Sequence, residues 1–216
     1  MADRLWKKID CGILVADAPV YLDETDTCYY ALDYVSGGGF RAGDGNDLIS
    51  NFQKPVSLKN TGQWKHKERA IEYIGAMVAS ALSDGVHIAA MPTSKVEHDP
   101  EYDDRLIRAL AAAKKRKPPL MVHRPIGRSA SSAKAKSGSG SRNPAAIIQD
   151  LTWLGFDGAE PEWFFLFDDV ITTGGHFKAC VQLTAQHCPK VKVAGLFCAK
   201  TMWPKPTDDS TTITLG

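Results

Sequence analysis

Short apolar runs alternate with segments of helical periodicity over most of the chain, from residue 85 onward. The clearest run, Phe-Phe-Leu-Phe at 164–167, is too short for a buried helix and fits a buried strand. Further apolar runs and helical spacings predict strands at 86–91, 120–122 and 191–199 and helices at 102–115 and 177–187. Strands that alternate with helices predict an α/β fold with a mainly parallel sheet, whose site lies at the carboxyl ends of the strands.

The first 80 residues follow a less regular pattern. Apolar runs at 11–16 and 28–35 predict two strands, and a glycine-rich segment at 36–46 predicts a loop. Over 65–82 the apolar residues share one helical face, which predicts an amphipathic helix packed on the sheet.

Candidate chemistry follows the predicted strand at 164–167. Asp168 and Asp169 are adjacent carboxylates, and a small turn of threonines and glycines at 172–175 precedes the next helix. Glycines let backbone N–H groups converge on one anion, the hydroxyls add donors, and the helix dipole favours negative charge at the same point. Carboxylates just before such a turn suit the vicinal hydroxyls of a sugar, so the pattern predicts a site for a ribose 5-phosphate.

This stretch resembles the phosphoribosyl-pyrophosphate (PRPP) motif of type I phosphoribosyltransferases, which has four hydrophobic residues, two acids, two apolar residues and then Thr-Thr-Gly. The resemblance implies the type I phosphoribosyltransferase fold, a mainly parallel sheet flanked by helices with a small N-terminal hood. It implies that the 5-phosphate binds to Thr172, Thr173, Gly174, Gly175 and His176. The family usually has Thr or Ser at the position of His176. The backbone N–H remains there, and the imidazole either supplies a cationic donor or weakens the site.

Two further loops are expected beside this turn. Pro92, Thr93, Ser94 and Lys95 follow the strand at 86–91, and in the family the loop at this place binds pyrophosphate. An ordinary polar loop is the alternative. A long Gly/Ser/Lys-rich loop at 126–144 predicts a lid, because loops of this length are usually functional or disordered. We expect Arg124 or Arg128 to receive pyrophosphate beside this lid.

The charges are segregated along the chain. The span 105–142 contains eleven of the 26 Lys and Arg residues and none of the 25 acids, which a net charge of +1 conceals. A basic lid would neutralise departing pyrophosphate. A solvated basic helix end and linker, or a nucleic-acid surface, are the alternatives.

Within the family the layout looks most like ComF-type proteins associated with competence. Only Arg142-Asn143 matches the Arg-x-x-Asn-type signature of their lid, and the resemblance covers about residues 85–200. The organisation that it implies is a hood at 1–60, a core at 61–203 with the lid at about 124–144, and a tail at 204–216.

Composition is compatible with this interpretation. A chain of 216 residues with 44% hydrophobic residues can bury one good core. Five widely spaced cysteines, an odd number, predict free thiols in a reducing compartment rather than disulfides or a zinc site. The chain begins with no secretory pattern and has no apolar run long enough for a bilayer, so we expect a cytoplasmic protein with no membrane partner.

The sequence therefore predicts transfer of ribose 5-phosphate from PRPP to an unidentified acceptor, with loss of pyrophosphate. Asp168 and Asp169 would hold the ribose hydroxyls. A Mg²⁺ ion would keep mostly water and substrate ligands. No direct protein ligand is expected, and Asp168 and Asp169 are the alternative if the protein contributes one. Whether the chain is an enzyme stays open, since a regulatory protein that senses PRPP or a nucleotide, or a DNA-handling accessory protein, is an alternative. A homodimer is also left open.

Overall fold

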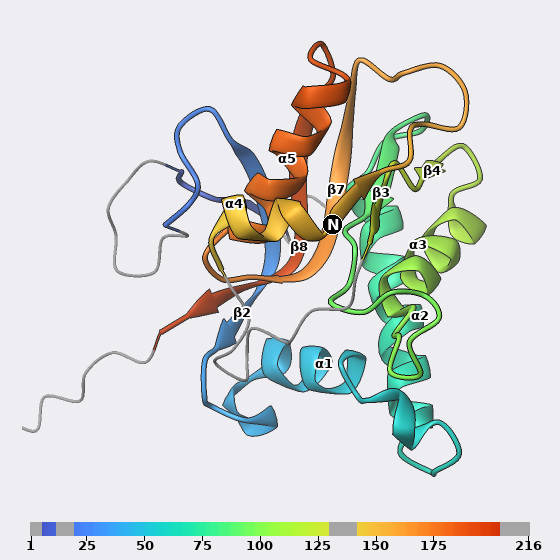
Figure 1. Cartoon of the computed structure of the whole chain (residues 1–216). Coiled ribbons are helices and arrows are strands. Elements are labelled where there is room, and N and C mark those ends of the chain that lie inside the picture. Colours follow the sequence, from blue (N-terminus) through green and yellow to red (C-terminus); the bar gives the residue numbers. More distant parts are fainter. Residues whose placement is uncertain (1–5, 12–19, 130–141, 204–216) are drawn as a thin grey trace, which may run out of the picture.

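A six-stranded sheet with helices on both faces forms the centre of the molecule (Figure 1). The computed structural model describes residues 6–11, 20–129 and 142–203. The strand order is β1-β2-β8-β7-β3-β4, in which β1 (Lys7–Lys8) is antiparallel to β2 (Thr27–Val35) and all other neighbours are parallel. The chain is therefore α/β with a mainly parallel sheet, as its sequence predicted.

The remaining elements occur in the predicted alternation. The other sheet strands are β3 (His87–Ala90), β4 (Met121–His123), β7 (Trp163–Ile171) and β8 (Lys192–Met202), and a separate hairpin pairs β5 (Ile126–Arg128) with β6 (Leu151–Trp153). The helices are α1 (Asp44–Phe52), α2 (Trp64–Ala81), α3 (Arg105–Arg116), α4 (Pro144–Ile147) and α5 (Gly175–His187). Short 3-10 turns are at Phe40–Ala42, Val56–Leu58 and Ile148–Asp150.

The core has two halves, one on each face of the sheet. Phe165 and Phe167 of β7 pack with α1, α2 and α3, whereas Phe164 and Leu166 pack with α5. Figure 1 shows α2 and α3 on one side and α5 with α4 on the other. A parallel strand covered on both faces is apolar at every position, which explains the uninterrupted run at 164–167.

Strand β7 is longer than the sequence predicted. It continues past Phe167 through both acids to Ile171, because pairing with β8 extends through Asp168 and Val170. Successive side chains of a strand point to opposite faces, so Asp168 and Asp169 lie on different sides of the sheet. The expectation that the two acids follow the strand as one pair was wrong for this reason.

Several other boundaries differ from the prediction. Helix α1 begins inside the predicted loop at 36–46, where the buried Asn46 side chain bonds both backbone groups of Val35 at 2.8 and 2.9 Å. Strand β5 and the start of α4 lie inside the predicted loop at 126–144. Strand β2, from the segment expected to form a hood, belongs to the main sheet. Most of the predicted strand at 11–16, the middle of the lid and the tail at 204–216 fall outside the described residues.

The strand order reverses between β3 and β7. From β3 the chain moves outward to β4, then returns to β7 on the other side of β3 and continues to β8. In open α/β sheets, ligands bind outside the carboxyl ends of the strands at such a reversal. The loop at 92–95 follows β3 and the turn at 172–175 follows β7, so the topology brings both predicted loops to this point.

A fully buried lysine joins three segments around α2. The Lys67 ammonium donates to the backbone oxygens of Phe52 at 3.0 Å and Lys54 at 2.7 Å, and to the Asp103 carboxylate at 2.7 Å. Burial lowers the pKa of Lys67, while Asp103 raises it in opposition. The end of α1 and the start of α3 are thereby held against α2.

Replacing this lysine is expected to destabilise the fold. In Lys67→Met the side chain keeps its apolar stem, but the carboxylate and two carbonyls lose a buried partner, at a cost of about 3 kcal/mol. Urea denaturation followed by circular dichroism measures the difference. Lys65→Met, at an exposed position of the same helix, is the control and should change stability by less than about 0.5 kcal/mol. Equal stability of the two variants would contradict this role.

Candidate functional site

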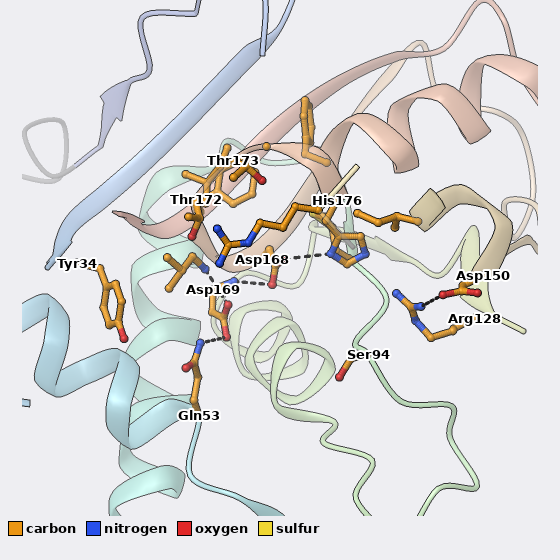
Figure 2. A pocket seen from close by; sticks show the side chains of 18 of the residues that line it. Tyr34, Gln53, Ser94, Arg128, Asp150, Asp168, Asp169, Thr172, Thr173 and His176 are labelled. Carbon is orange, nitrogen blue, oxygen red and sulfur yellow. Dashed lines mark hydrogen bonds and ion pairs between the residues drawn. The ribbon is translucent and has the colours of Figure 1, made fainter. Parts of the chain in front are cut away.

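A cavity of about 310 Å³ lies at the carboxyl end of β7 (Figure 2). Its volume is at the lower end of the range for small-molecule sites, about 300–1,000 Å³. Most of the predicted PRPP motif lines it, together with side chains from β2, the residue after α1, the loop after β3 and the hairpin. The predicted site residues that line it are Ser94, Arg128, Asp168, Asp169, Thr172, Thr173, Gly174 and His176.

Two glycines shape the turn at the start of α5. Gly174 has φ 78°, in the left-handed region that favours glycine. At Gly175 a Cβ atom would lie 1.9 Å from the carbonyl oxygen of Arg142, so the segment before α4 approaches the turn as closely as glycine permits. The first N–H groups of a helix have no partner within the helix, and those of α5 begin at this turn beside the cavity.

The two threonines of the turn are fixed by neighbours. The Thr172 and Thr201 hydroxyls are 2.7 Å apart, which ties the turn to β8. The Thr173 carbonyl oxygen accepts from the Tyr21 N–H at 2.9 Å. The turn is therefore anchored from both sides before any ligand binds.

Asp169 is held by partners on the face of α1 and α3. Its Oδ2 accepts from the Arg105 guanidinium at 2.6 and 3.1 Å and from the Gln53 amide at 2.9 Å. Its Oδ1 accepts from the Val170 N–H at 2.8 Å. Asp169 thus serves as a buried anchor for α1 and α3, in addition to lining the cavity.

Arg105 continues this network away from the cavity. Its guanidinium also donates to Asp103 at 3.0 Å, and Asp103 in turn accepts from Lys67. Burial alone would lower the pKa of Arg105, but Asp169 and Asp103 raise it, so the guanidinium stays charged. Two cations and two carboxylates therefore balance one another inside the fold.

Asp168 faces the opposite side of the sheet, toward α5. Its Oδ1 accepts from the Asp169 N–H at 2.8 Å, and its Oδ2 lies 3.7 Å from Nδ1 of His176. Burial and the neighbouring Asp169 charge raise the pKa of Asp168. A cation or a hydrogen-bond donor placed beside its Oδ2 would relieve that cost.

His176 is directed at Asp168 in the structure (Figure 2). Burial by itself would lower the pKa of its ring, but Cys180 and Asp168 have the larger, opposite effect. The pKa of His176 is therefore raised to about 10, which favours imidazolium at neutral pH. Its Nε2 is buried and has no hydrogen-bond partner among the described residues. The ring therefore adds positive charge beside Asp168.

The loop at 92–95 is divided between two cavities. Ser94 lines the first, whereas Pro92, Thr93 and Lys95 line a neighbouring cavity of about 580 Å³. The Lys95 ammonium pairs with Asp99 at 3.4 Å and Glu101 at 3.2 Å. This cation is therefore engaged with acids of its own loop.

The two arginines expected at the lid behave differently. Arg128 lines both cavities, and its largely buried side chain donates to the Thr93 carbonyl at 2.6 Å and to Asp150 at 3.3 Å. Arg124 is half-exposed, pairs with Glu97 and lines only the second cavity. Of these two arginines, Arg128 therefore lines the same cavity as the PRPP motif.

Many bases of the acid-free span meet acids from other parts of the chain. Helix α3 packs on α2, so that Arg108 pairs with Glu68 and Arg116 pairs with Glu72. Lys117 pairs with Asp84 after α2. Among the described residues, much of the positive charge of this span is therefore balanced by acids from other segments.

Three residues of the site were missed from the sequence. Gln53 and Asp150 line the cavity, and Arg105 holds Asp169. Arg105 carried a usable signal, because a cation in the first turn of a helix opposes the dipole and calls for a nearby acid. The other two had none, since only the folded chain brings them near β7.

Comparison with known proteins adds no relative: no family model matches the chain, and a search of the curated proteins finds no match. None of the described helices combines the length and the apolar character that crossing a bilayer requires. The function is therefore argued from the site.

The two acids should differ in their effect on stability. Asp169→Asn leaves the buried Arg105 with one carboxylate fewer and should cost about 3 kcal/mol. Asp168→Asn removes a charge that burial disfavours and should change stability by less than about 1 kcal/mol. Denaturation midpoints of the two variants at pH 7 provide the comparison. A larger loss in Asp168→Asn would contradict the assigned division of roles.

The close approach at Gly175 predicts a steric effect. Gly175→Ala must displace the backbone of Arg142, at a cost of about 1–3 kcal/mol. Gly62→Ala is the control, because its Cβ would meet nothing within 4 Å. Thermal unfolding of both variants measures the effect, and an unchanged melting temperature in Gly175→Ala would rule out this packing.

Proposed function

We propose that the chain is a phosphoribosyltransferase-like protein of the type I fold that binds PRPP and transfers its ribose 5-phosphate to an acceptor. The bond from C1 of the ribose to pyrophosphate breaks, and a bond from C1 to the acceptor forms. The observation that carries the proposal is a cavity at the strand reversal that joins the turn at 172–175, the Asp168 carboxylate and Arg128.

Each part of the ligand has a matching group. The N–H groups at the start of α5 suit the 5-phosphate, since a glycine turn before a helix binds anions. Asp168 suits the ribose hydroxyls, because a carboxylate accepts two donors and its Oδ2 faces only His176 at 3.7 Å among the contacts described. Ser94 and Arg128 suit the pyrophosphate, from the loop after β3 and the hairpin.

Asp168 also fits the expected Mg²⁺ better than Asp169 does. Both oxygens of Asp169 accept hydrogen bonds from Arg105, Gln53 and Val170, which leaves it poorly suited as a ligand. Mg²⁺ usually keeps several waters and binds one or two carboxylates together with substrate phosphates. When bound, such an ion would neutralise charge on the pyrophosphate.

The residues of the site would act by position and charge. The transition state carries positive charge at C1, and Asp168 lies where it can orient the hydroxyls next to that centre. Arg128 is held by Thr93 and Asp150, so its charge is fixed before a ligand arrives. A guanidinium held in place in this way would stabilise the negative charge on the leaving pyrophosphate, and its side chain would not have to move.

A sensor that binds PRPP or a nucleotide without turnover is the second candidate. It is favoured by the pairing of Lys95 with Asp99 and Glu101, which occupies the cation of the loop after β3. The imidazole of His176 near Asp168 also replaces the hydroxyl typical of the family. A DNA-handling role remains a prediction from the sequence resemblance, testable by a salt-steep affinity for single-stranded DNA.

Ligand binding tests the proposal directly. Calorimetry with PRPP and Mg²⁺ should give saturable binding, and Asp168→Asn should weaken it about tenfold or more through loss of charge-assisted hydrogen bonds. Glu72→Gln, an exposed carboxylate of α2 remote from the cavity lining, should leave the affinity unchanged. If Asp168→Asn binds PRPP as tightly as the wild type, the site assignment is wrong.

Pyrophosphate release separates the two candidates. The wild-type protein is incubated with PRPP, Mg²⁺ and a panel of nitrogenous bases, and pyrophosphate is measured. Release above the base-free control supports the transferase. Binding of PRPP without release for any base supports the sensor.

A further inference from the structure

Two histidines join the outer strand of the sheet to its neighbour. Nδ1 of His87, in β3, lies 2.7 Å from Nε2 of His123, the last residue of β4, and the two ring planes are nearly parallel, at 4°. Strand β4 has three residues, pairs with β3 and ends the sheet. His123 is only 4% exposed, so its half of the contact is shielded from water. A short edge strand is therefore held by a side-chain hydrogen bond in addition to its backbone pairing.

Aromatic rings extend this contact to the hairpin. The ring of Phe156, three residues after β6, meets the rings of His123, Trp153 and Phe164 edge to face, with centroids 5.4, 5.6 and 5.1 Å away. Trp153 is also stacked on His187, the last residue of α5, at 5.3 Å. Strand β5 begins three residues after His123, and β6 ends at Trp153. The hairpin is thus attached to the rest of the fold at both of its ends.

The hydrogen bond between the two imidazoles limits the number of protons that the pair can carry. A neutral imidazole has one N–H donor and one acceptor nitrogen, whereas an imidazolium has two donors. The pair keeps its bond when both rings are neutral or when one is charged. When both are charged, two N–H donors face each other across 2.7 Å and two like charges are adjacent. The folded protein therefore resists the second proton.

The surroundings of His123 also disfavour a charge on its ring. Burial lowers the pKa of His123 most, and the charge of His87 lowers it next. Lys114 of α3 has a smaller effect in the same direction, and Asp157, after β6, acts in the opposite direction. An unfolded histidine takes up its proton near pH 6.5, so below about this pH the unfolded chain binds more protons than the folded one. Stability then falls as the pH is lowered.

On the other side of the pair, two acids line a cavity of about 250 Å³ together with His87. Asp84 lies 3.6 Å from the Lys117 ammonium, and Glu162 lies 3.5 Å from the Lys192 ammonium. Both acids are already paired with lysines, which reduces what they can contribute to a doubly protonated imidazole pair.

We infer that the His87–His123 pair is an acid-sensitive contact that holds the outer strand β4 and the hairpin of β5 and β6 on the sheet. A second proton breaks the hydrogen bond between the rings and loosens β4, whose backbone pairing with β3 covers only three residues. Arg128, the last residue of β5, lines both cavities, so the loosening extends to the candidate site. The contact does not depend on the proposed function, since neither histidine lines the cavity of about 310 Å³.

Hydrogen exchange at two pH values tests the loosening. Backbone amides of β4, β5 and β6 are followed in the full-length protein at about pH 7.5 and about pH 5.5, with rates corrected for the intrinsic effect of pH on exchange. The open form accepts, with a pKa of about 6.5, a proton that the closed form excludes, so protection of these amides should fall about tenfold between the two values. Unchanged protection would overturn the inference.

A matched pair of variants assigns the effect to the imidazole pair. In His123→Gln the amide can still meet Nδ1 of His87 but does not titrate, so the fall in protection should be about tenfold smaller than in the wild type. His66→Gln, at an exposed position of α2, should behave as the wild type does. The same fall in His123→Gln as in the wild type would overturn the inference.

Titration of the wild-type imidazoles by NMR gives an answer even if His123→Gln does not fold. The ring of His123 should take up its proton below about pH 6.5, the value of an unfolded histidine, and protection of the β4 amides should fall over the same pH range. Protonation of His123 at or above this value, with the β4 amides still protected, would show that the fold accepts the charge and would overturn the inference.

Discussion

The ion pair between Asp169 and Arg105 is the interaction on which the arrangement of this site depends. A carboxylate buried beside the centre of a parallel sheet is tolerated only when a cation and hydrogen-bond donors reach it. Arg105 provides the cation at the first residue of α3, and Gln53 provides a donor at the end of α1. The buried carboxylate of Asp169 therefore positions the end of α1 and the start of α3 beside the cavity.

Because of this pairing, the two acids of the PRPP motif have different environments. Strand β7 continues through both, so its alternation sends Asp169 into the framework and Asp168 toward α5 and His176. The framework acid is fixed by four hydrogen bonds, whereas the other has an oxygen directed at the cavity side of the sheet. The two acids of the motif therefore differ in how tightly the fold holds them.

Long-range pairing also changes the meaning of the charge pattern. The acid-free span suggested a strongly basic lid, yet Arg108 and Arg116 meet Glu68 and Glu72 because α3 packs along α2. Arg128, which lines the cavity, is paired in the same way with Asp150. The described part of the chain therefore carries less net positive charge around α3 than the sequence suggested.

The sequence by itself determined the features that follow from local rules. Run length and periodicity identified β2, β3, β7, β8, α2, α3 and α5, because buried strands and amphipathic helices impose their spacing on neighbouring residues. The turn at 172–175 was identifiable because threonines and glycines stand between an apolar run and a segment of helical periodicity, where a strand-to-helix turn is expected. Only the tertiary structure decided which of the two acids pairs with Arg105, which cations are engaged by acids, and that Gln53 and Arg105 belong to the site. These depend on strand register and helix packing between segments far apart in the chain, which no local pattern encodes.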